Sequence, residues 1–210
     1  MTTRIEAPVS LEPGDHLTRE EFHRRYCARP DIKRAELIEG VVYLPSPVRF
    51  DRDAEQTGAI VLWLGTYAVR TSSVRFGNDG TLLLDDGNEP QPDALLWRPE
   101  SSGAHLNADG YIVGAPQLVV EVAASSVSYD LHEKKEAYRR NGVGEYIVWR
   151  VLDRAIDWFR LVDGTYVTVE PEPDGIVESN QFPGLRLHVP SMLAGDVAGV
   201  LAALDPTAPA

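Results

Sequence analysis

The stretch that decides the fold is residues 116–123, which read Pro-Gln-Leu-Val-Val-Glu-Val-Ala. The nearly continuous apolar, mostly β-branched run within it is typical of a strand that is buried on both faces of a sheet. Glu121 is the one charged residue inside this run. A carboxylate in a buried strand is costly unless it is paired or binds a cation. Glu121 therefore indicates an ion pair with a nearby Arg or Lys, a strand end near solvent, or a functional site.

Strands and helices are mixed on both sides of this stretch, without a strict alternation. Apolar spacing and capping signals predict helices over residues 17–26, 54–69, 131–141 and 190–201. Alternating or apolar runs predict strands within residues 34–44 (two, around a turn), 74–76, 81–84, 94–97, 117–123, 145–151, 156–161, 166–169 and 185–189, the last of which closes the sheet. Residues 100–115 read as a loop. The pattern favours an α/β (α+β) domain with a mixed sheet.

Composition limits the classes of protein to which the chain can belong. The 210 residues include 20 Lys and Arg against 32 Asp and Glu, a net charge of −12, and 43% are hydrophobic. This acidic balance argues against a broad basic surface that coats nucleic acid, but not against a small site that meets phosphate through a metal. A single cysteine excludes an internal disulfide and a cysteine-based zinc site.

The organisation predicted for the chain is simple. We expect one domain over residues 1–204 and a flexible tail over residues 205–210. The sequence has neither an apolar run long enough for a membrane helix nor an N-terminal secretion signal. The expected compartment is therefore the cytoplasm.

Three carboxylates occupy strand positions that are normally apolar. Glu36 begins the strand at 36–38, Asp93 follows Pro92 before the strand at 94–97, and Glu121 lies within its own strand. A Pro-Asp pair, a loop, and then a Glu on the next strand is the spacing that carries two acids to one edge of a sheet. Converging acids repel one another, and hard divalent cations, which prefer oxygen ligands, relieve that repulsion. Such a metal can activate water and stabilise a phosphoryl oxygen.

Seven short motifs along the chain carry a family resemblance. They are Arg34-Ala35-Glu36-Leu37-Ile38-Glu39-Gly40, Ser46-Pro47, Gln91-Pro92-Asp93, Pro116-Gln117-Leu118-Val119-Val120-Glu121-Val122, Asp130-Leu131-His132-Glu133-Lys134, Tyr138, and Gly142-Val143-Gly144-Glu145-Tyr146. In order and spacing, from about residue 17 to residue 194, the chain resembles the Uma2 family of the PD-(D/E)xK superfamily. The resemblance implies a restriction-endonuclease-like fold, with a mixed β-sheet flanked by helices.

The resemblance also implies a chemistry and a set of site residues. Glu36, Asp93 and Glu121 would bind Mg²⁺ or Mn²⁺, and a phosphodiester bond would be hydrolysed. The superfamily has a lysine two residues after the Glu, where this chain has Ala123. In Uma2-like sequences the lysine is on the following helix, a place that Lys134 matches. From that helix an ammonium group could stabilise the attacking hydroxide or the scissile phosphate.

Several positions leave two interpretations open. Helical periodicity places Lys134 and Lys135 on opposite sides of the buried helix face and does not choose between them; the resemblance chooses Lys134. Asp130 is either the N-cap of this helix, which Asp favours, or a site residue. Tyr138 is either a packing residue or one whose hydroxyl faces the site, and Glu39 reads as a turn residue.

One departure from the family pattern concerns activity. Uma2 relatives carry a His shortly after Ser46-Pro47, where this chain reads Val48-Arg49-Phe50-Asp51-Arg52-Asp53. Its role is lost or is taken over by another residue, for which Arg52 is a candidate. The five histidines of the chain are scattered and form no ligand pattern.

The leading hypothesis is a metal-dependent endonuclease that hydrolyses DNA, with Glu36, Asp93, Glu121 and Lys134 in the catalytic site. The alternative is a catalytically silent, restriction-endonuclease-like interaction protein, which the acidic charge and the missing His favour. A nuclease should gather basic residues around its acids; the candidates are Arg34, Arg49, Arg52, Arg75, Arg139 and Arg140. A homodimer is expected, because a duplex offers two antiparallel scissile bonds. The strands at 145–151 and 156–161 are candidates for its interface.

Overall fold

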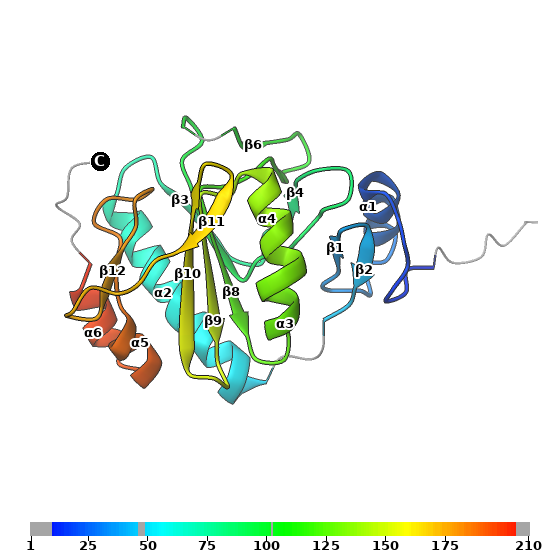
Figure 1. Cartoon of the computed structure of the whole chain (residues 1–210). Helices are drawn as coiled ribbons and strands as arrows, with labels where there is room; N and C mark the ends of the chain where they lie inside the picture. The colour runs from blue at the N-terminus through cyan, green and yellow to red at the C-terminus, as the bar shows by residue number, and fades with distance from the viewer. Residues whose placement is uncertain (1–9, 46–48, 102, 205–210) are drawn as a thin grey trace, which may run out of the picture.

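A mixed six-stranded sheet lies at the centre of the molecule (Figure 1). The computed structural model describes residues 10–45, 49–101 and 103–204. The strand order is β11-β10-β9-β8-β5-β3, in which β8 and β9 are parallel and the other neighbours are antiparallel. The strands are β3 (Arg75–Gly77), β5 (Ala94–Trp97), β8 (Leu118–Ala123), β9 (Glu145–Arg150), β10 (Ala155–Val162) and β11 (Thr165–Thr168).

Helices cover both faces of this sheet because the central strand is apolar on both. Leu118, Val120 and Val122 of β8 pack in one core with α2, α5 and α6. Val119 and Ala123 face the opposite side and pack in a second core with the segment α3-η2-α4. The helices are α2 (Glu55–Arg70), preceded by the π-helical turn η1 (Phe50–Ala54), α3 (Val127–Tyr129), the π-helical turn η2 (Asp130–Lys134), α4 (Lys135–Asn141), α5 (Val189–Ala194) and α6 (Val197–Ala202).

The N-terminal segment forms a small unit at the side of the sheet (Figure 1). Helix α1 (Arg19–Cys27) packs Phe22 against the hairpin of β1 (Glu36–Ile38) and β2 (Val41–Tyr43). Thr18 caps α1 by accepting a hydrogen bond from the Glu21 amide. The hairpin turns at Glu39 and Gly40, both with positive φ (53° and 75°), as a tight turn between twisted strands requires. Leu37 and Glu89 join this unit to the chain that leads into β5 through two backbone hydrogen bonds.

The predicted fold class is confirmed, and most predicted elements are present within a few residues of their expected bounds. The predicted loop at 100–115 instead contains β6 (His105–Leu106) and β7 (Ile112–Val113), which join β4 (Leu82–Leu83) in a separate three-stranded sheet. The strand expected to close the main sheet, β13 (Arg186–His188), pairs only with β12 (Ile176–Glu178) among the described residues. That prediction was wrong because periodicity identifies a strand but not its partner.

The surface gives information on assembly and on membranes. Strand β9 lies between β8 and β10 and is buried, so it offers no surface to a partner, contrary to the sequence-based expectation.

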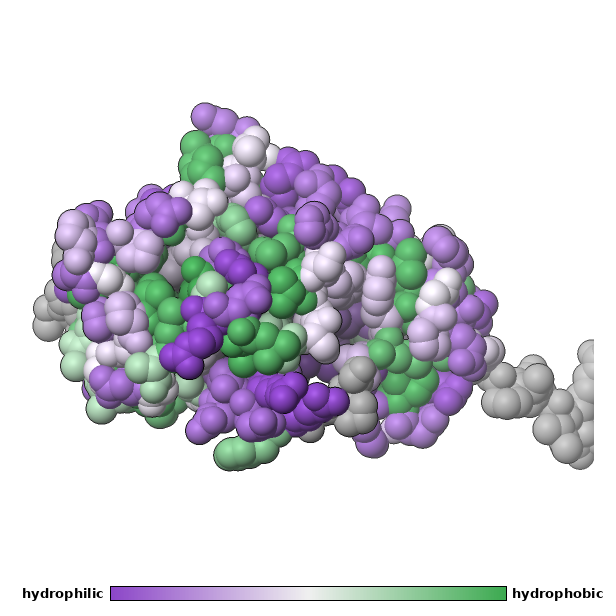
Figure 2. All heavy atoms as spheres, turned by 60° about the horizontal axis from the view of Figure 1, so that its bottom comes forward, coloured by the Kyte–Doolittle hydropathy of each residue, from purple (hydrophilic) through white to green (hydrophobic). Residues whose placement is uncertain are grey.

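Figure 2 shows hydrophilic and apolar side chains interspersed over the face that lies at the bottom of Figure 1. Within the described residues, no helix has the length and apolar character needed to span a membrane. The single-domain prediction for residues 1–204 stays a prediction, and the predicted tail at 205–210 lies outside the described residues.

Candidate active site

Glu121 lies in the middle of β8 on the sheet face that α3, η2 and α4 cover. Alternate residues of a strand point to opposite faces, so Glu121 shares its face with Val119 and Ala123. The Glu121 residue is only 2% exposed. Of the three interpretations that the sequence left open, a strand end near solvent is therefore excluded.

The helical segment over this face is irregular at the point where Lys134 lies. Residues 130–134 form a π-helical turn between α3 and α4. A π-helical turn inserts a residue into the helical repeat and changes the direction of the side chains that follow, and such turns are frequent at functional sites. Lys134 is consequently 3% exposed and points at the sheet, whereas the Lys135 ammonium lies over the Phe159 ring, 3.4 Å from its centroid.

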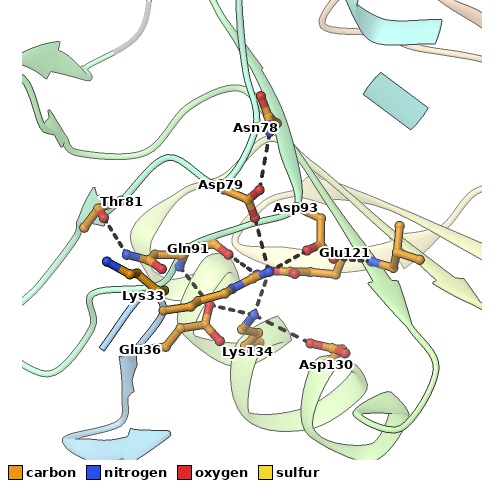
Figure 3. A network of polar contacts seen from close by, with 12 residues as sticks. Lys33, Glu36, Asn78, Asp79, Thr81, Gln91, Asp93, Glu121, Asp130 and Lys134 are labelled. Carbon is orange, nitrogen blue, oxygen red and sulfur yellow. Dashed lines mark hydrogen bonds and ion pairs between the residues drawn. The ribbon is translucent and has the colours of Figure 1, made fainter. Parts of the chain in front are cut away.

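Lys134 joins two of the predicted acids (Figure 3). Its Nζ lies 2.9 Å from Glu36 Oε1 and 2.9 Å from Glu121 Oε1. The Tyr138 hydroxyl donates to the same Glu121 oxygen over 2.9 Å. Tyr138 is also fully buried in the core of this face. It is therefore both a packing residue and one whose hydroxyl faces the site.

Asp93 reaches the cluster from the neighbouring strand. Ala94 pairs with Val120 in the antiparallel ladder of β5 and β8. Continued by one residue, the same register places Asp93 opposite Glu121. Asp93 Oδ2 accepts a hydrogen bond from the Val122 amide over 2.7 Å. Asp93 and Glu121 therefore lie side by side and not on opposite faces of the sheet (Figure 3).

Arg34 and Gln91 make further contacts with Asp93 and Glu36. The Arg34 guanidinium lies 3.0 Å from Asp93 Oδ1 and also donates to the Gln91 carbonyl. The backbone N–H of Gln91 donates to Glu36 Oε1 over 2.7 Å. Arg34 was considered only as one of several basic residues, and Gln91 was not predicted as a contact of Glu36. The motif Gln91-Pro92-Asp93 was the available signal, since it carries both residues.

Asp130 is a member of the cluster and not the N-cap that its residue type favoured. The helical segment begins at Val127, and Ser126 is its N-cap, so Asp130 lies a full turn inside it. Asp130 Oδ1 is 3.8 Å from Lys134 Nζ, and its other oxygen accepts from the Ser126 hydroxyl over 2.6 Å. The spacing of four residues between Asp130 and Lys134 could have indicated this pair.

Burial and mutual repulsion change the titration of these groups. Burial raises the pKa of Glu121 well above its ordinary value; Lys134 opposes this shift, and Asp93, Asp130 and Glu36 add to it. Burial also raises the pKa of Asp130. Burial disfavours the charged form of Lys134, but Glu121, Glu36 and Asp130 raise its pKa above the ordinary value and keep it protonated. The cluster therefore holds a protonated lysine among acids, and each ionised acid disfavours the ionisation of the others.

The donor set fits a hard divalent cation in its chemistry. The carboxylates of Glu36, Asp93, Glu121 and Asp130 face Lys134 and Arg34, which leaves a formal charge of −2 for these six side chains when all are ionised. The exposed Asp79 also pairs with Arg34, over 3.2 Å. Oxygen ligands and excess negative charge are what Mg²⁺ prefers. In the part of the chain that the structure describes, no three His, Cys, Asp or Glu side chains are grouped as metal ligands. Lys134 and Arg34 occupy the positions between the acids instead.

A comparison with protein-family models decides the family. The model of Uma2, described as "Putative restriction endonuclease", matches residues 19–190, which include all of the cluster. The chain belongs to the Uma2 family. The predicted family membership is therefore confirmed.

Uma2 membership agrees with the fold of a solved structure. The chain is similar to a crystal structure described as a putative nuclease belonging to DUF820 from Anabaena variabilis, with a TM-score of 0.57 and 15% sequence identity. The match covers 77% of this chain and 90% of that one. At this identity the similarity shows the fold alone. No match was found among curated proteins.

The basic residues of this Uma2 chain are only partly gathered at the acids. Arg34 is in the cluster, whereas Arg139 pairs with Glu136, and Arg140 pairs with Glu39 and Asp85. Arg52, the candidate substitute for the missing His, lies in η1, 3.6 Å from Asp51. Residues 46–48, which include the motif before it, lie outside the described residues.

Proposed function

We propose that this Uma2 protein is a Mg²⁺- or Mn²⁺-dependent endonuclease that hydrolyses phosphodiester bonds of DNA. The observation that carries the proposal is the position of Lys134. Its ammonium lies beside Glu121 on the face of β8 that residue 123 shares. That is the face from which a lysine two residues after the Glu would act in the PD-(D/E)xK superfamily. A helix thus supplies the cation that the strand, with Ala123, does not.

Each residue of the cluster has a chemical role in this proposal. Glu36, Asp93 and Glu121 would hold the metal, which supplies Lewis-acid stabilisation of the phosphoryl oxygen and an activated water when it is bound. Lys134 would stabilise negative charge on the attacking hydroxide or the scissile phosphate.

Neighbouring side chains position the acids. Tyr138 donates to Glu121, and Arg34 holds the carboxylate of Asp93 from the side opposite the Val122 amide. Side chains that are fixed in this way before substrate binds lower the cost of reaching the productive geometry.

The test is cleavage of supercoiled plasmid and of single-stranded DNA with Mg²⁺, Mn²⁺ or EDTA. Cleavage is expected with either metal and not with EDTA. The Asp93→Asn variant should fall to the level seen with EDTA, because it loses a negative ligand. Asp109→Asn, which alters an exposed loop residue of the same type, is the matched control and should cleave normally. Equal cleavage by both variants would contradict the proposed site.

The alternative function is a catalytically silent interaction protein that keeps the fold. The net charge of −12 favours it, because a nuclease must approach a polyanion. Two results together would support this alternative. Neither substrate would be cleaved at any metal concentration, and divalent ions would not change the melting temperature, which would show that no metal binds.

We further propose that the protein acts as a homodimer, since cleavage of both strands of a duplex suits two-fold symmetry. Light scattering at the concentration of the cleavage assay should give twice the chain mass of 23.2 kDa. A mass of one chain under those conditions would contradict the dimer and leave the chemistry of the site untouched.

A further inference from the structure

A second group of reactive side chains lies outside the acid cluster, on helix α1. His23 Nδ1 is 2.7 Å from Glu89 Oε1, and its other ring nitrogen, Nε2, is 3.6 Å from the sulfur of Cys27. Cys27 is exposed, and it is the single cysteine of the chain. The three side chains therefore form a continuous series of thiol, imidazole and carboxylate.

Local structure fixes the order of this series. His23 and Cys27 are four residues apart in α1 and so lie on one helix face. Glu89 is held by backbone hydrogen bonds to Leu37 in both directions. Tyr111 packs its ring edge-on against His23, with centroids 4.9 Å apart, and places its hydroxyl 3.8 Å from the Cys27 sulfur. The imidazole is thus held on two sides.

Glu89 carries a second and independent sign of a site. It is 0% exposed, and in the described part of the chain its buried Oε2 has no hydrogen-bond partner. Burial raises its pKa, and the hydrogen bond from His23 opposes that shift. A buried carboxylate oxygen without a partner costs stability that packing alone does not explain.

A pocket of about 230 Å³ adjoins these groups. Its lining includes Cys27, His23, Glu89 and Tyr111, together with Tyr26 and Gln91. The thiol, the imidazole and the buried carboxylate therefore border one space that is accessible from solvent.

We propose that Cys27 is a nucleophilic thiol that exchanges with small disulfides, with His23 as its base and Glu89 as a positioning residue. Glu89 accepts a hydrogen bond from the Nδ1–H group of His23, which leaves Nε2 unprotonated and able to accept the proton of the thiol. The Cys27 thiolate attacks one sulfur of the disulfide, a new sulfur–sulfur bond forms, and the old one breaks. The departing thiolate takes the proton from His23, so that one thiol and one disulfide become another thiol and a mixed disulfide.

Thiol–disulfide exchange is the reaction that these side chains support without any additional catalytic group. It needs an accessible thiol, an acceptor for its proton and space for the incoming group. Attack on an acyl group would in addition need preorganised donors for an oxyanion. The pocket would hold the group that remains attached to Cys27.

The experiment measures the rate at which the folded chain reacts with the aromatic disulfide dithiobis(nitrobenzoate) at pH 7 in the presence of EDTA. Because the chain has one cysteine, the released thiol reports Cys27 alone, and mass spectrometry should show one adduct per chain. An ordinary thiol is only a few per cent ionised at pH 7. The folded chain should therefore react roughly 10-fold faster than the same chain in urea.

Variants separate activation from simple exposure. His23→Gln should lose the acceleration and show the pH profile of an ordinary thiol, whereas His105→Gln, an exposed histidine on β6, should react like the wild type. Glu89→Gln should shift the pH profile without changing the final stoichiometry. If the folded chain reacts no faster than the unfolded one, or if a folded His23→Gln variant reacts at the wild-type rate, the proposal is wrong.

Discussion

Replacement of Lys134 by methionine is expected to reduce DNA hydrolysis by roughly 10²–10³-fold, the usual effect of removing one electrostatic contact to a transition state. The same replacement of Lys135 should leave the rate nearly unchanged. Lys134 contacts Glu36 and Glu121, whereas the Lys135 ammonium lies over the ring of Phe159 in β10. The two variants change the same residue type at adjacent positions, but only Lys134 contacts the acids of the cluster.

Stability must be controlled in this comparison. Removing Lys134 leaves three buried acids without their shared cation, and breaking a buried ion pair costs about 3–5 kcal/mol. Rates should therefore be compared at a temperature where circular dichroism shows both variants folded. Added Mg²⁺ should still raise the melting temperature of the Lys134→Met variant, because the carboxylates remain. A folded Lys134→Met variant with the wild-type rate would remove Lys134 from the mechanism.

The position of the acids was predictable because it follows from strand geometry. Glu121 interrupts an apolar run, and Asp93 immediately precedes the adjacent strand, so the ladder that pairs Ala94 with Val120 brings them together. Glu36 stood out by its strand position, but its place beside the other acids was predictable only through the family motif. Its strand β1 belongs to a different sheet, and the contact with Lys134 depends on how the N-terminal unit packs.

The direction of Lys134 could not be derived from helical periodicity. A regular helix over residues 131–141 places Lys134 and Lys135 symmetrically about the buried face. The π-helical turn at 130–134 breaks that symmetry, and a periodic pattern does not reveal such a turn. The same helix starts earlier than predicted, at Val127, which moves Asp130 from the cap into the cluster.

Partners of short strands were the least predictable part of the fold. The strands β6, β7 and β12 have two or three residues each, too few to show an alternating pattern. Strand β13 was located correctly but was assigned to the wrong sheet, because its partner β12 was not predicted. These errors lie away from the acid cluster and leave its geometry unaffected.

The Glu121→Gln variant is expected to lose hydrolysis and to become more stable at neutral pH. Glutamine has the shape of glutamate, and its oxygen can accept the bonds from Lys134 and Tyr138. Lys134 would keep Glu36 and Asp130 as counter-charges. The variant therefore leaves no unpaired cation and relieves the repulsion of Glu121 by Asp93, Asp130 and Glu36. A gain of about 1 kcal/mol would correspond to roughly 2–4 °C in the melting temperature of a chain of this size.

The dependence on pH follows from the raised pKa of Glu121. Between its ordinary value of 4.5 and the raised value, the folded wild type binds more protons than the unfolded chain. The stability of the folded wild type therefore falls as the pH rises through this range. Below pH 4.5 Glu121 is protonated in both states and no longer lowers the stability. Glutamine does not titrate, so the stability advantage of the variant should be absent in acid and should grow toward neutral pH.

Thermal melting of both proteins at several pH values, with and without Mg²⁺, measures this difference. Mg²⁺ should stabilise the wild type more than the variant, because the variant lacks one negative ligand, and high Mg²⁺ should restore part of the hydrolysis. A variant that is less stable than the wild type at every pH would show that Glu121 serves as the structural counter-ion of Lys134. A buried, ionised acid lowers the free energy of unfolding of the metal-free protein unless it binds a cation or a proton. The proposed function explains that cost, because the same negative charge that destabilises the fold is what attracts the metal.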